Sequence, residues 1–430
     1  MYWPCARLLP ACCLSLFFWT AATTAATTTA ADFVEPRGAL TLSDAISAAL
    51  QRNPALRSAV FDLRAADARI AQAGLRPNPE LGIALENFGG SGEIRNTRAL
   101  ESTLMLSQAI ELGGQRGRRV EAARYERDAA ALERDARQLD VLAEVTRRFI
   151  DVAADQEQLL LTRRGTRLLE KTFAAIERRV AAARAPEAEK SRAAIALGRA
   201  RLEEKRAEQE LLAAHRQLAA LWGSTEPRFG DAQANLFELP PVTNFEGLLA
   251  RLKTNPDFLR FATEQRLRDA QWRLAKAEAK SSLSVGAGVR RFEATGDTGL
   301  VVDFSMPLPF ANRNQGAIRE ADIRRDRVQL DEQAAFVNAQ ATLFELYQSL
   351  QQARARVAGL REQLTPLAET ALAQTQYGYE RGRFSYLELA DAQRELLELQ
   401  REAIEAAATY HRVFADIERL TREPLAQSAN

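Results

Sequence analysis

Two carboxylates near the end of the chain have a spacing that suits the attraction of cations. Glu388 and Asp391 are three residues apart, which places both on one face of a helix. A simpler interpretation exists for the first of them, because Ser385-Tyr386-Leu387-Glu388 is a capping box in which the glutamate satisfies a free N–H at the helix start. Asp391 lies beyond the capping turn, so capping does not account for it. An acidic site and a capped, solvated helix start both stay open at this point.

The rest of the sequence contains no pattern that indicates an enzyme. The only histidines, His215 and His411, are expected at the surface or at a seam between helices rather than as metal ligands. All three cysteines, Cys5, Cys12 and Cys13, fall in the segment expected to be removed on export, which excludes disulfides and thiolate metal sites from the mature chain. No nucleophile–base pair or phosphate-binding loop is present, so neither catalysis nor a cofactor is predicted.

The first 31 residues have the composition of a secretory signal peptide. A single charge, Arg7, precedes an apolar core from Leu8 to Trp19 and an Ala/Thr-rich run that ends near Asp32. The core is shorter than the about 20 residues that a transmembrane helix needs. Without Arg7, the chain carries equal numbers of basic and acidic side chains, which gives no reason to expect a nucleic-acid partner.

Two segments alternate apolar and polar residues with the period of two that predicts β-hairpins. They cover residues 81–110 and 283–308, and each contains a glycine-rich stretch where the chain can reverse. Pro307 ends the second hairpin because proline brings no N–H to the ladder.

Long segments rich in Ala, Leu, Arg and Glu predict two helical hairpins, over residues 115–221 and 314–420. Leu142 and Phe149 keep the seven-residue spacing of helices packed along a seam. A helix from about 117 to 184 would be about 100 Å long at 1.5 Å per residue. Its counterpart is expected to run without a break from Gln315 to about Tyr377.

The two halves of the chain are copies of one unit. Asn53-Pro54 recurs 202 residues later, Ser107 recurs at an offset of 198 and Ala193 at 199, and length changes are expected only in turns. The predicted division is a signal peptide over 1–31, a body over 32–430 with repeats over 41–221 and 245–420, and linker or tail segments over 222–244 and 421–430. Residues 32–40 are expected to be an extended lead without regular structure.

Four strands of about ten residues are long enough to cross a bilayer at a tilt, but single-chain membrane barrels have at least eight strands. Open sheet edges are excluded from lipid because each unpaired backbone group costs several kcal/mol there. Several copies of the chain are therefore needed. Three copies would supply twelve strands, and the long helices would continue the tube as an α-helical barrel.

In this order the motifs resemble those of the TolC-type outer-membrane factors, the exit ducts of tripartite efflux and secretion systems. The resemblance rests on Leu42 to Pro54, on the strand-to-helix exits Ser107 to Gly117 and Ser305 to Gly316, and on Tyr377 to Ala392. Glu111-Leu112-Gly113-Gly114-Gln115-Arg116 and Met306-Pro307-Leu308-Pro309-Phe310 are most similar to the branch that serves heavy-metal pumps of the resistance-nodulation-division class.

The resemblance implies a mainly α-helical protein with membrane β-hairpins, assembled as a homotrimer. Its barrel would lie in the outer membrane and its helical tunnel in the periplasm, with a periplasmic adaptor and an inner-membrane pump as partners. The expected function is passive conduction of heavy-metal cations. A multidrug or type I secretion duct of the same family is the alternative, and a periplasmic adaptor or coiled-coil scaffold is a more distant one.

The resemblance also assigns roles to the tips of the two helical hairpins. At the inner tip, where the tunnel narrows, Glu388 and Asp391 from three copies would form a ring of six carboxylates, and such rings select cations. Tyr379 matches a tyrosine that holds the closed tip, although packing between helices would also explain it. Adaptor contact is expected on both tips, at Arg184, Pro186, Glu189, Gly382, Arg383 and Ser385.

Overall fold

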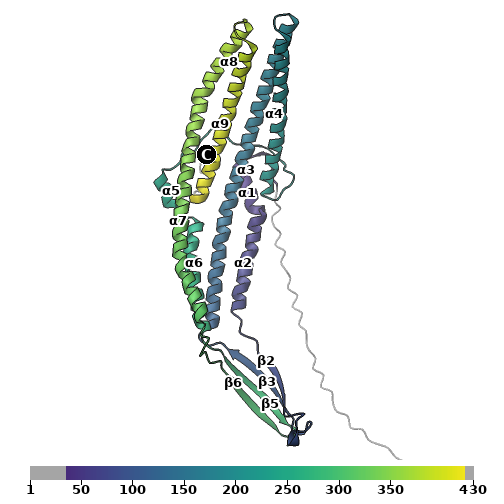
Figure 1. Cartoon of the computed structure of the whole chain (residues 1–430), viewed down its shortest axis with the longest axis vertical. Helices are drawn as coiled ribbons and strands as arrows, with labels where there is room; N and C mark the ends of the chain where they lie inside the picture. Colours follow the sequence, from purple (N-terminus) through teal and green to yellow (C-terminus); the bar gives the residue numbers. More distant parts are fainter. Residues whose placement is uncertain (1–34, 422–430) are drawn as a thin grey trace, which may run out of the picture. The chain divides into compact units, whose positions relative to one another are not determined.

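The computed structural model describes residues 35–421, in which the repeat seen in the sequence recurs as two similar runs of strands and helices (Figure 1). The predicted signal peptide lies outside these residues, as does the predicted tail apart from Thr421. No helix within residues 35–421 combines the length and the apolar composition needed to cross a membrane.

The elements of the first half follow in chain order. They are β1 (Gly38–Leu40), α1 (Leu42–Arg52), α2 (Pro54–Ala73), β2 (Glu80–Glu86), the short helical turn η1 (Gly92–Ile94), β3 (Glu101–Ile110), α3 (Gln115–Ala181) and α4 (Glu187–Ala220). Those of the second half are β4 (Phe229–Ala232), α5 (Phe245–Leu252), α6 (Pro256–Glu278), β5 (Leu283–Phe292), β6 (Thr298–Ser305), α7 (Gln315–Ala358), the π-turn η2 (Gly359–Leu364), α8 (Thr365–Glu380) and α9 (Tyr386–Thr421).

In each half of the chain, the asparagine of the repeated Asn-Pro dipeptide joins the start of one helix to the end of another. The side-chain oxygen of Asn53 accepts the first free N–H groups of α2, and its amide donates to the carbonyl of Leu221 (2.9 Å), at the end of α4. Asn255 caps α6 in the same way and donates to the carbonyls of Arg419 and Leu420 near the end of α9 (2.8 and 2.9 Å). Each asparagine is buried, so these bonds hold the start of one helix against the end of another.

The four long strands form one antiparallel sheet in the order β2-β3-β5-β6. Its centre is the pairing of β3 with β5, which extends over ten residue pairs from Glu101 opposite Phe292 to Ile110 opposite Leu283. The apolar residues of the outer strands face solvent in the isolated chain, as Ile83 (72% exposed) and Leu300 (89% exposed) illustrate. Among residues 35–421, the outer edges of β2 and β6 pair with no other strand.

The expectation of a lead without regular structure over residues 32–40 is wrong for residues 38–40. Gly38–Leu40 forms β1, which pairs in parallel with β4 in the segment that joins the two halves. Leu40 is almost fully buried, and its carbonyl accepts the N–H of Gln233 (2.8 Å). Burial of one leucine against a strand far along the chain decides this pairing, and three residues of sequence are too few to show an alternating pattern.

The segment that joins the halves packs against the long helices. Gln156 of α3 accepts the backbone N–H of Ala232 (2.6 Å), and His411 of α9 lies 3.0 Å from the carbonyl of Leu236. His215 of α4 packs its ring against Phe229. Both histidines therefore lie at seams between a helix and this segment, where burial lowers their pKa values.

The outward helix of the second half differs from its expected unbroken form. It is divided into α7 and α8 by the π-turn Gly359–Leu364, whereas α3 runs unbroken over 67 residues. Pro366 lies two residues beyond the turn and has no N–H to donate to the carbonyl of Glu362, so a regular α-helix is disfavoured there by about 3 kcal/mol.

Candidate functional site

The turns α3–α4 and α8–α9, called the first and second tips below, close with the same backbone geometry. In the first tip, the N–H of Arg184 donates to the carbonyl of Arg179 (2.8 Å). In the second, the N–H of Arg383 donates to the carbonyl of Gly378 (2.9 Å). This bond runs from the third residue past each helix back into its last turn, as in the Schellman motif. The two tips are therefore equivalent in backbone and differ in side chains.

The Schellman motif needs a left-handed residue directly after the C-cap, two positions past the last residue of the helix. The second tip has Gly382 there, with φ +71°, whereas the first has Ala183, with φ +53°. The left-handed conformation is unfavourable for a residue with a Cβ and unstrained for glycine. The first tip therefore carries backbone strain that the second does not.

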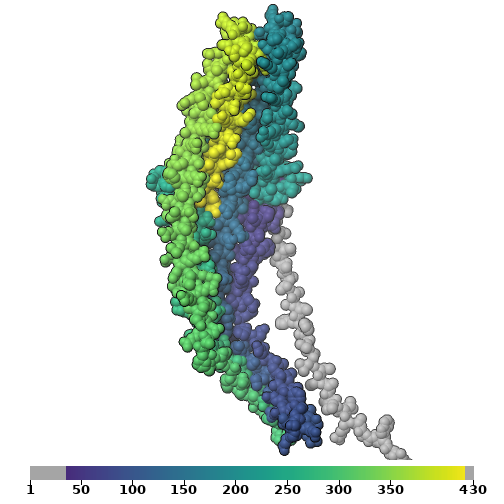
Figure 2. Space-filling model, viewed as in Figure 1, coloured from purple at the N-terminus to yellow at the C-terminus, as the bar shows by residue number. Residues whose placement is uncertain are grey.

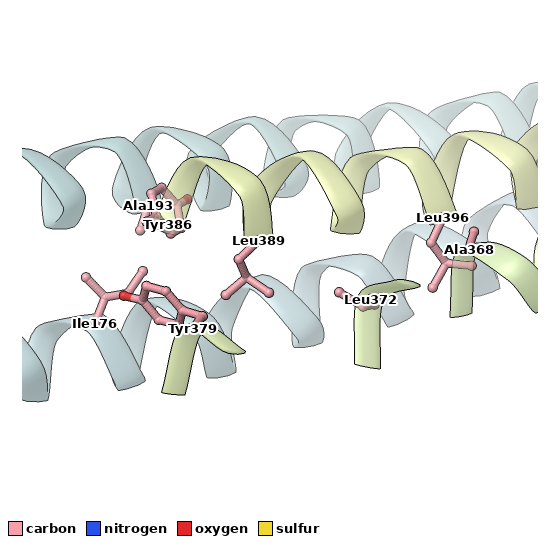
Figure 3. Close-up of a cluster of buried hydrophobic side chains, with 8 residues drawn as sticks. All are labelled: Ile176, Ala193, Ala368, Leu372, Tyr379, Tyr386, Leu389 and Leu396. Carbon is pink, nitrogen blue, oxygen red and sulfur yellow. The ribbon is translucent and has the colours of Figure 1, made fainter. Parts of the chain in front are cut away.

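Tyr379 at the end of α8 connects the second tip to the first. Its ring is buried in an apolar cluster with Ile176 of α3 and Leu389 of α9 (Figure 3). Its hydroxyl donates to a carboxylate oxygen of Glu189 on α4 (3.1 Å). Arg179 of α3 donates to its carbonyl (2.8 Å) and places a guanidinium 4.6 Å from the ring centre. One residue of the second tip thus makes polar contacts with both helices of the first.

Burial, followed by the charge of Glu189 and the hydrogen bond to it, raises the pKa of Tyr379 to about 12. The neutral hydroxyl is the form that donates to the carboxylate. Because the pKa is raised, the stabilisation from this contact is complete below about pH 10, the ordinary tyrosine value. It is lost as the pH rises through about 12. The connection between the tips therefore persists at every pH near neutrality.

The carboxylate of Glu388 caps the start of α9. It accepts the N–H of Ser385 (2.7 Å) and the Ser385 hydroxyl (2.8 Å), and the Glu388 N–H donates back to that hydroxyl oxygen (3.3 Å). The backbone hydrogen bond is the main cause that lowers the pKa of Glu388, and the hydroxyl adds to it. The side chain is exposed, so it presents a negative charge to solvent while it serves as a cap.

Asp391 lies one turn further along α9 and is also exposed. Its carboxylate forms an ion pair (2.7 Å) with Arg394, which lies three residues further along the same helix. An exposed pair of this kind is weak and screened by salt. The structure thus brings Glu388 and Asp391 onto one exposed stretch of helix, and it places Tyr379 apart from them, buried against α3 and α4.

The residues expected to meet an adaptor lie at or next to the two tips. Glu189 is half-buried because it accepts the Tyr379 hydroxyl. Arg179 is a site residue that the sequence did not single out, since nothing distinguishes it from the many other arginines of α3 before the tips are brought together. Among residues 35–421, no group of three or more His, Cys, Asp or Glu side chains is placed to hold a metal ion. The other expected adaptor residues are exposed or half-buried: Arg184, Pro186, Gly382, Arg383 and Ser385.

Comparison with known proteins gives consistent results for sequence and fold. The profile of the family described as Outer membrane efflux protein matches residues 45–224 and 250–421. The cobalt-zinc-cadmium resistance protein CzcC of Cupriavidus metallidurans is 31% identical over 364 residues, which cover 85% of each chain.

Two solved structures have the same fold. A membrane protein from Pseudomonas aeruginosa superposes with a TM-score of 0.73 at 22% identity, over 88% of this chain and 90% of that one. CusC, solved in a study of folding and transmembrane channel formation, gives 0.73 at 18% identity, over 88% and 91%. These similarities confirm the predicted fold class, a mostly helical chain with β-hairpins.

Relief of the strain at Ala183 should stabilise the protein. We expect Ala183→Gly to raise the free energy of unfolding by about 1 kcal/mol, since a left-handed residue with a Cβ is disfavoured by roughly that amount. The matched variant Gly382→Ala should lower it by a similar amount, because no atom lies within 4 Å of the added Cβ and only the backbone is affected. Denaturant unfolding followed by circular dichroism measures both, and equal stabilities would contradict the assignment of strain.

Proposed function

Because this chain belongs to the outer membrane efflux protein family, as its motifs indicated, we propose that it is the outer-membrane exit channel of a tripartite system that expels heavy-metal cations. The observation that carries the choice of cargo is the 31% identity, over 85% of both chains, with a protein of cobalt, zinc and cadmium resistance. The chain acts as a conduit without catalysis. A periplasmic adaptor docks on the channel, and an inner-membrane pump supplies the energy for transport.

The unpaired edges of the sheet support assembly from several copies. With β2 at one edge and β6 at the other, β6 of one copy can pair with β2 of the next until the ring closes. Three copies give twelve strands without an open edge, which satisfies every backbone group in lipid. The exposed apolar side chains of the outer strands then meet the bilayer.

The surface of α7 supports the same assembly. Ile323, Leu330 and Val337 follow one another at seven-residue spacing and are each more than half exposed. The helix that carries them lies in the green band along one edge of the molecule (Figure 2). The opposite side of α7, which includes Leu343 and Leu350, is buried within the chain. A regular apolar stripe at this spacing is typical of helices that pack against another helix, and the neighbouring copy supplies one.

The contacts of Tyr379 support a closed resting aperture. They join the second tip to the first within one chain, so the tunnel opens when these contacts break. Arg184 and Arg383 are available to an adaptor because their side chains already face solvent at the tips. An adaptor that docks there would act next to the contacts that must break.

The cargo is tested by removing the gene and measuring growth on a panel of divalent metals and drugs. We expect the strain to lose tolerance of cobalt, zinc or cadmium and to regain it when the intact chain is supplied again. Drug tolerance should stay unchanged. Loss of drug tolerance alone would contradict the metal cargo and favour the multidrug alternative.

The acidic pair should give the channel its preference for cations. We expect Glu388→Gln combined with Asp391→Asn to move the reversal potential toward zero in planar bilayers under a salt gradient, because six negative charges leave the mouth of a trimer. Glu332→Gln, which removes an exposed carboxylate from α7, is the control and should leave the reversal potential unchanged. An unchanged potential in the double variant would rule out the acidic ring.

Loss of the Tyr379 hydroxyl should favour the open channel. Tyr379→Phe keeps the buried ring and removes the hydrogen bond to the charged carboxylate of Glu189, which contributes about 1.5–3 kcal/mol in each copy. The open fraction in single-channel recordings should therefore rise. Tyr386→Phe is the matched control, since Tyr386 lies in the same cluster and no hydrogen bond of its hydroxyl is found among residues 35–421. Equal open fractions in all three proteins would refute a role for this contact in closure.

A further inference from the structure

The offset between the two repeats changes by one residue inside the outward helix of the second half, so the expectation that length changes fall only in turns between elements is wrong here. Buried and half-buried residues at seven-residue spacing locate the change. At an offset of 198, Val145, Val152 and Leu159 of α3 match Leu343, Leu350 and Val357 of α7. At 199, Thr166, Phe173 and Val180 of α3 match Thr365, Leu372 and Tyr379 of α8. The second repeat therefore has one extra residue between Val357 and Thr365, which is where the π-turn lies.

A π-turn closes its hydrogen bonds one residue later than an α-helix does, so it takes up an inserted residue without turning the helix beyond it. This keeps the buried stripe of α8 in phase with that of α7. Pro366 favours the irregular turn because it has no N–H for the carbonyl of Glu362. The equivalent position in the first repeat is Arg167, and α3 continues through it as a regular helix.

A matched pair of threonines shows what the π-turn changes locally. The hydroxyl of Thr166 in α3 donates to the carbonyl of Thr162, one turn back (3.1 Å). The hydroxyl oxygen of the equivalent Thr365 is buried and has no hydrogen-bond partner among residues 35–421. A buried polar group without a partner is unfavourable. The π-turn therefore lowers the stability of the second repeat at Thr365, whereas Thr166 in the first repeat has its hydrogen bond.

The surroundings of the π-turn leave room for rearrangement. A groove of about 290 Å³ that is open to solvent lies beside it, and its lining includes Phe237, Arg361, Thr365 and Pro366. The Arg361 guanidinium lies 4.1 Å from the centre of the Phe237 ring, in the segment that joins the two halves. Because this groove is open to solvent, the side chains that line it at the π-turn can move without displacing a close-packed core.

We propose that the π-turn is a joint at which α8 turns about its own axis relative to α7. The proposal rests on the proposed function, because it identifies the part of the chain that moves when the closed aperture opens. When the π-turn becomes regular α-helix, the extra residue rotates α8 by about 100°, the angle of one residue. Tyr379 at the far end of α8 then leaves Glu189 and Arg179, and the two tips separate.

The direct test removes the joint and leaves the rest of the helix in phase. Deletion of Gln363 combined with Pro366→Ala copies the first repeat and should give an unbroken helix. We expect this variant to fold, to reach the outer membrane and to have a higher Tm, while channel opening and metal tolerance are lost. Normal opening and tolerance in the folded variant would overturn the proposal.

Two controls separate the joint from general damage. Pro366→Ala alone keeps the extra residue and should retain opening. Deletion of Arg164 from α3 removes a residue where there is no insertion, so it should put the buried stripe out of phase and prevent folding. If the deletion of Gln363 with Pro366→Ala is equally harmful to folding, the extra residue is not a removable insertion and the proposal fails.

Hydrogen exchange tests the joint independently of transport. In the intact protein, the amides of residues 360–364 should exchange about tenfold faster or more than those of residues 161–165 in α3, because an irregular turn opens more readily than a regular helix. Equal exchange rates in the two segments would overturn the proposed joint, even if the channel still conducts. Fast exchange in a protein that neither conducts nor confers tolerance would instead count against the proposed function and leave the joint supported.

Discussion

The seams between the long helices depend on buried side chains that recur with a seven-residue period. In α3, Val145, Val152 and Leu159 lie on this spacing, and Phe149 and Ile150 are buried between them. Because these residues must stay on the buried face, the phase of each helix determines which side chains meet at its far end. The contact of Tyr379 with Glu189, two long helices away from the sheet, exists only because the phase is kept along α7 and α8. An inserted residue is therefore tolerated only where an irregular turn absorbs it.

Much of the fold follows from local sequence patterns. The hairpins have alternating residues, the helix starts have capping residues such as Thr41 and Asn53, and the duplication supports each assignment twice. The pairing of β1 with β4 could not be predicted, because it joins short segments far apart in the chain. Pro366 lies within the helix predicted from Gln315 to about Tyr377, and a proline alone does not determine whether a helix kinks, ends or adopts a π-turn.

The candidate site was only partly accessible from the sequence. The spacing of Ser385 and Glu388 identified the cap, and the same local rule relates Asp391 to Arg394. A cap does not exclude an electrostatic role, since the Glu388 carboxylate stays exposed while it accepts its hydrogen bonds. Arg179 could not be identified in advance, because its contact with Tyr379 joins residues 200 positions apart.

The asparagines that close each half of the chain are both followed by proline. Asparagine deamidates when the backbone nitrogen of the next residue attacks its side-chain amide, and a proline nitrogen has no hydrogen to lose in that reaction. Asn53 and Asn255 are therefore protected from a common form of chemical ageing at the two places where one side chain joins two helices.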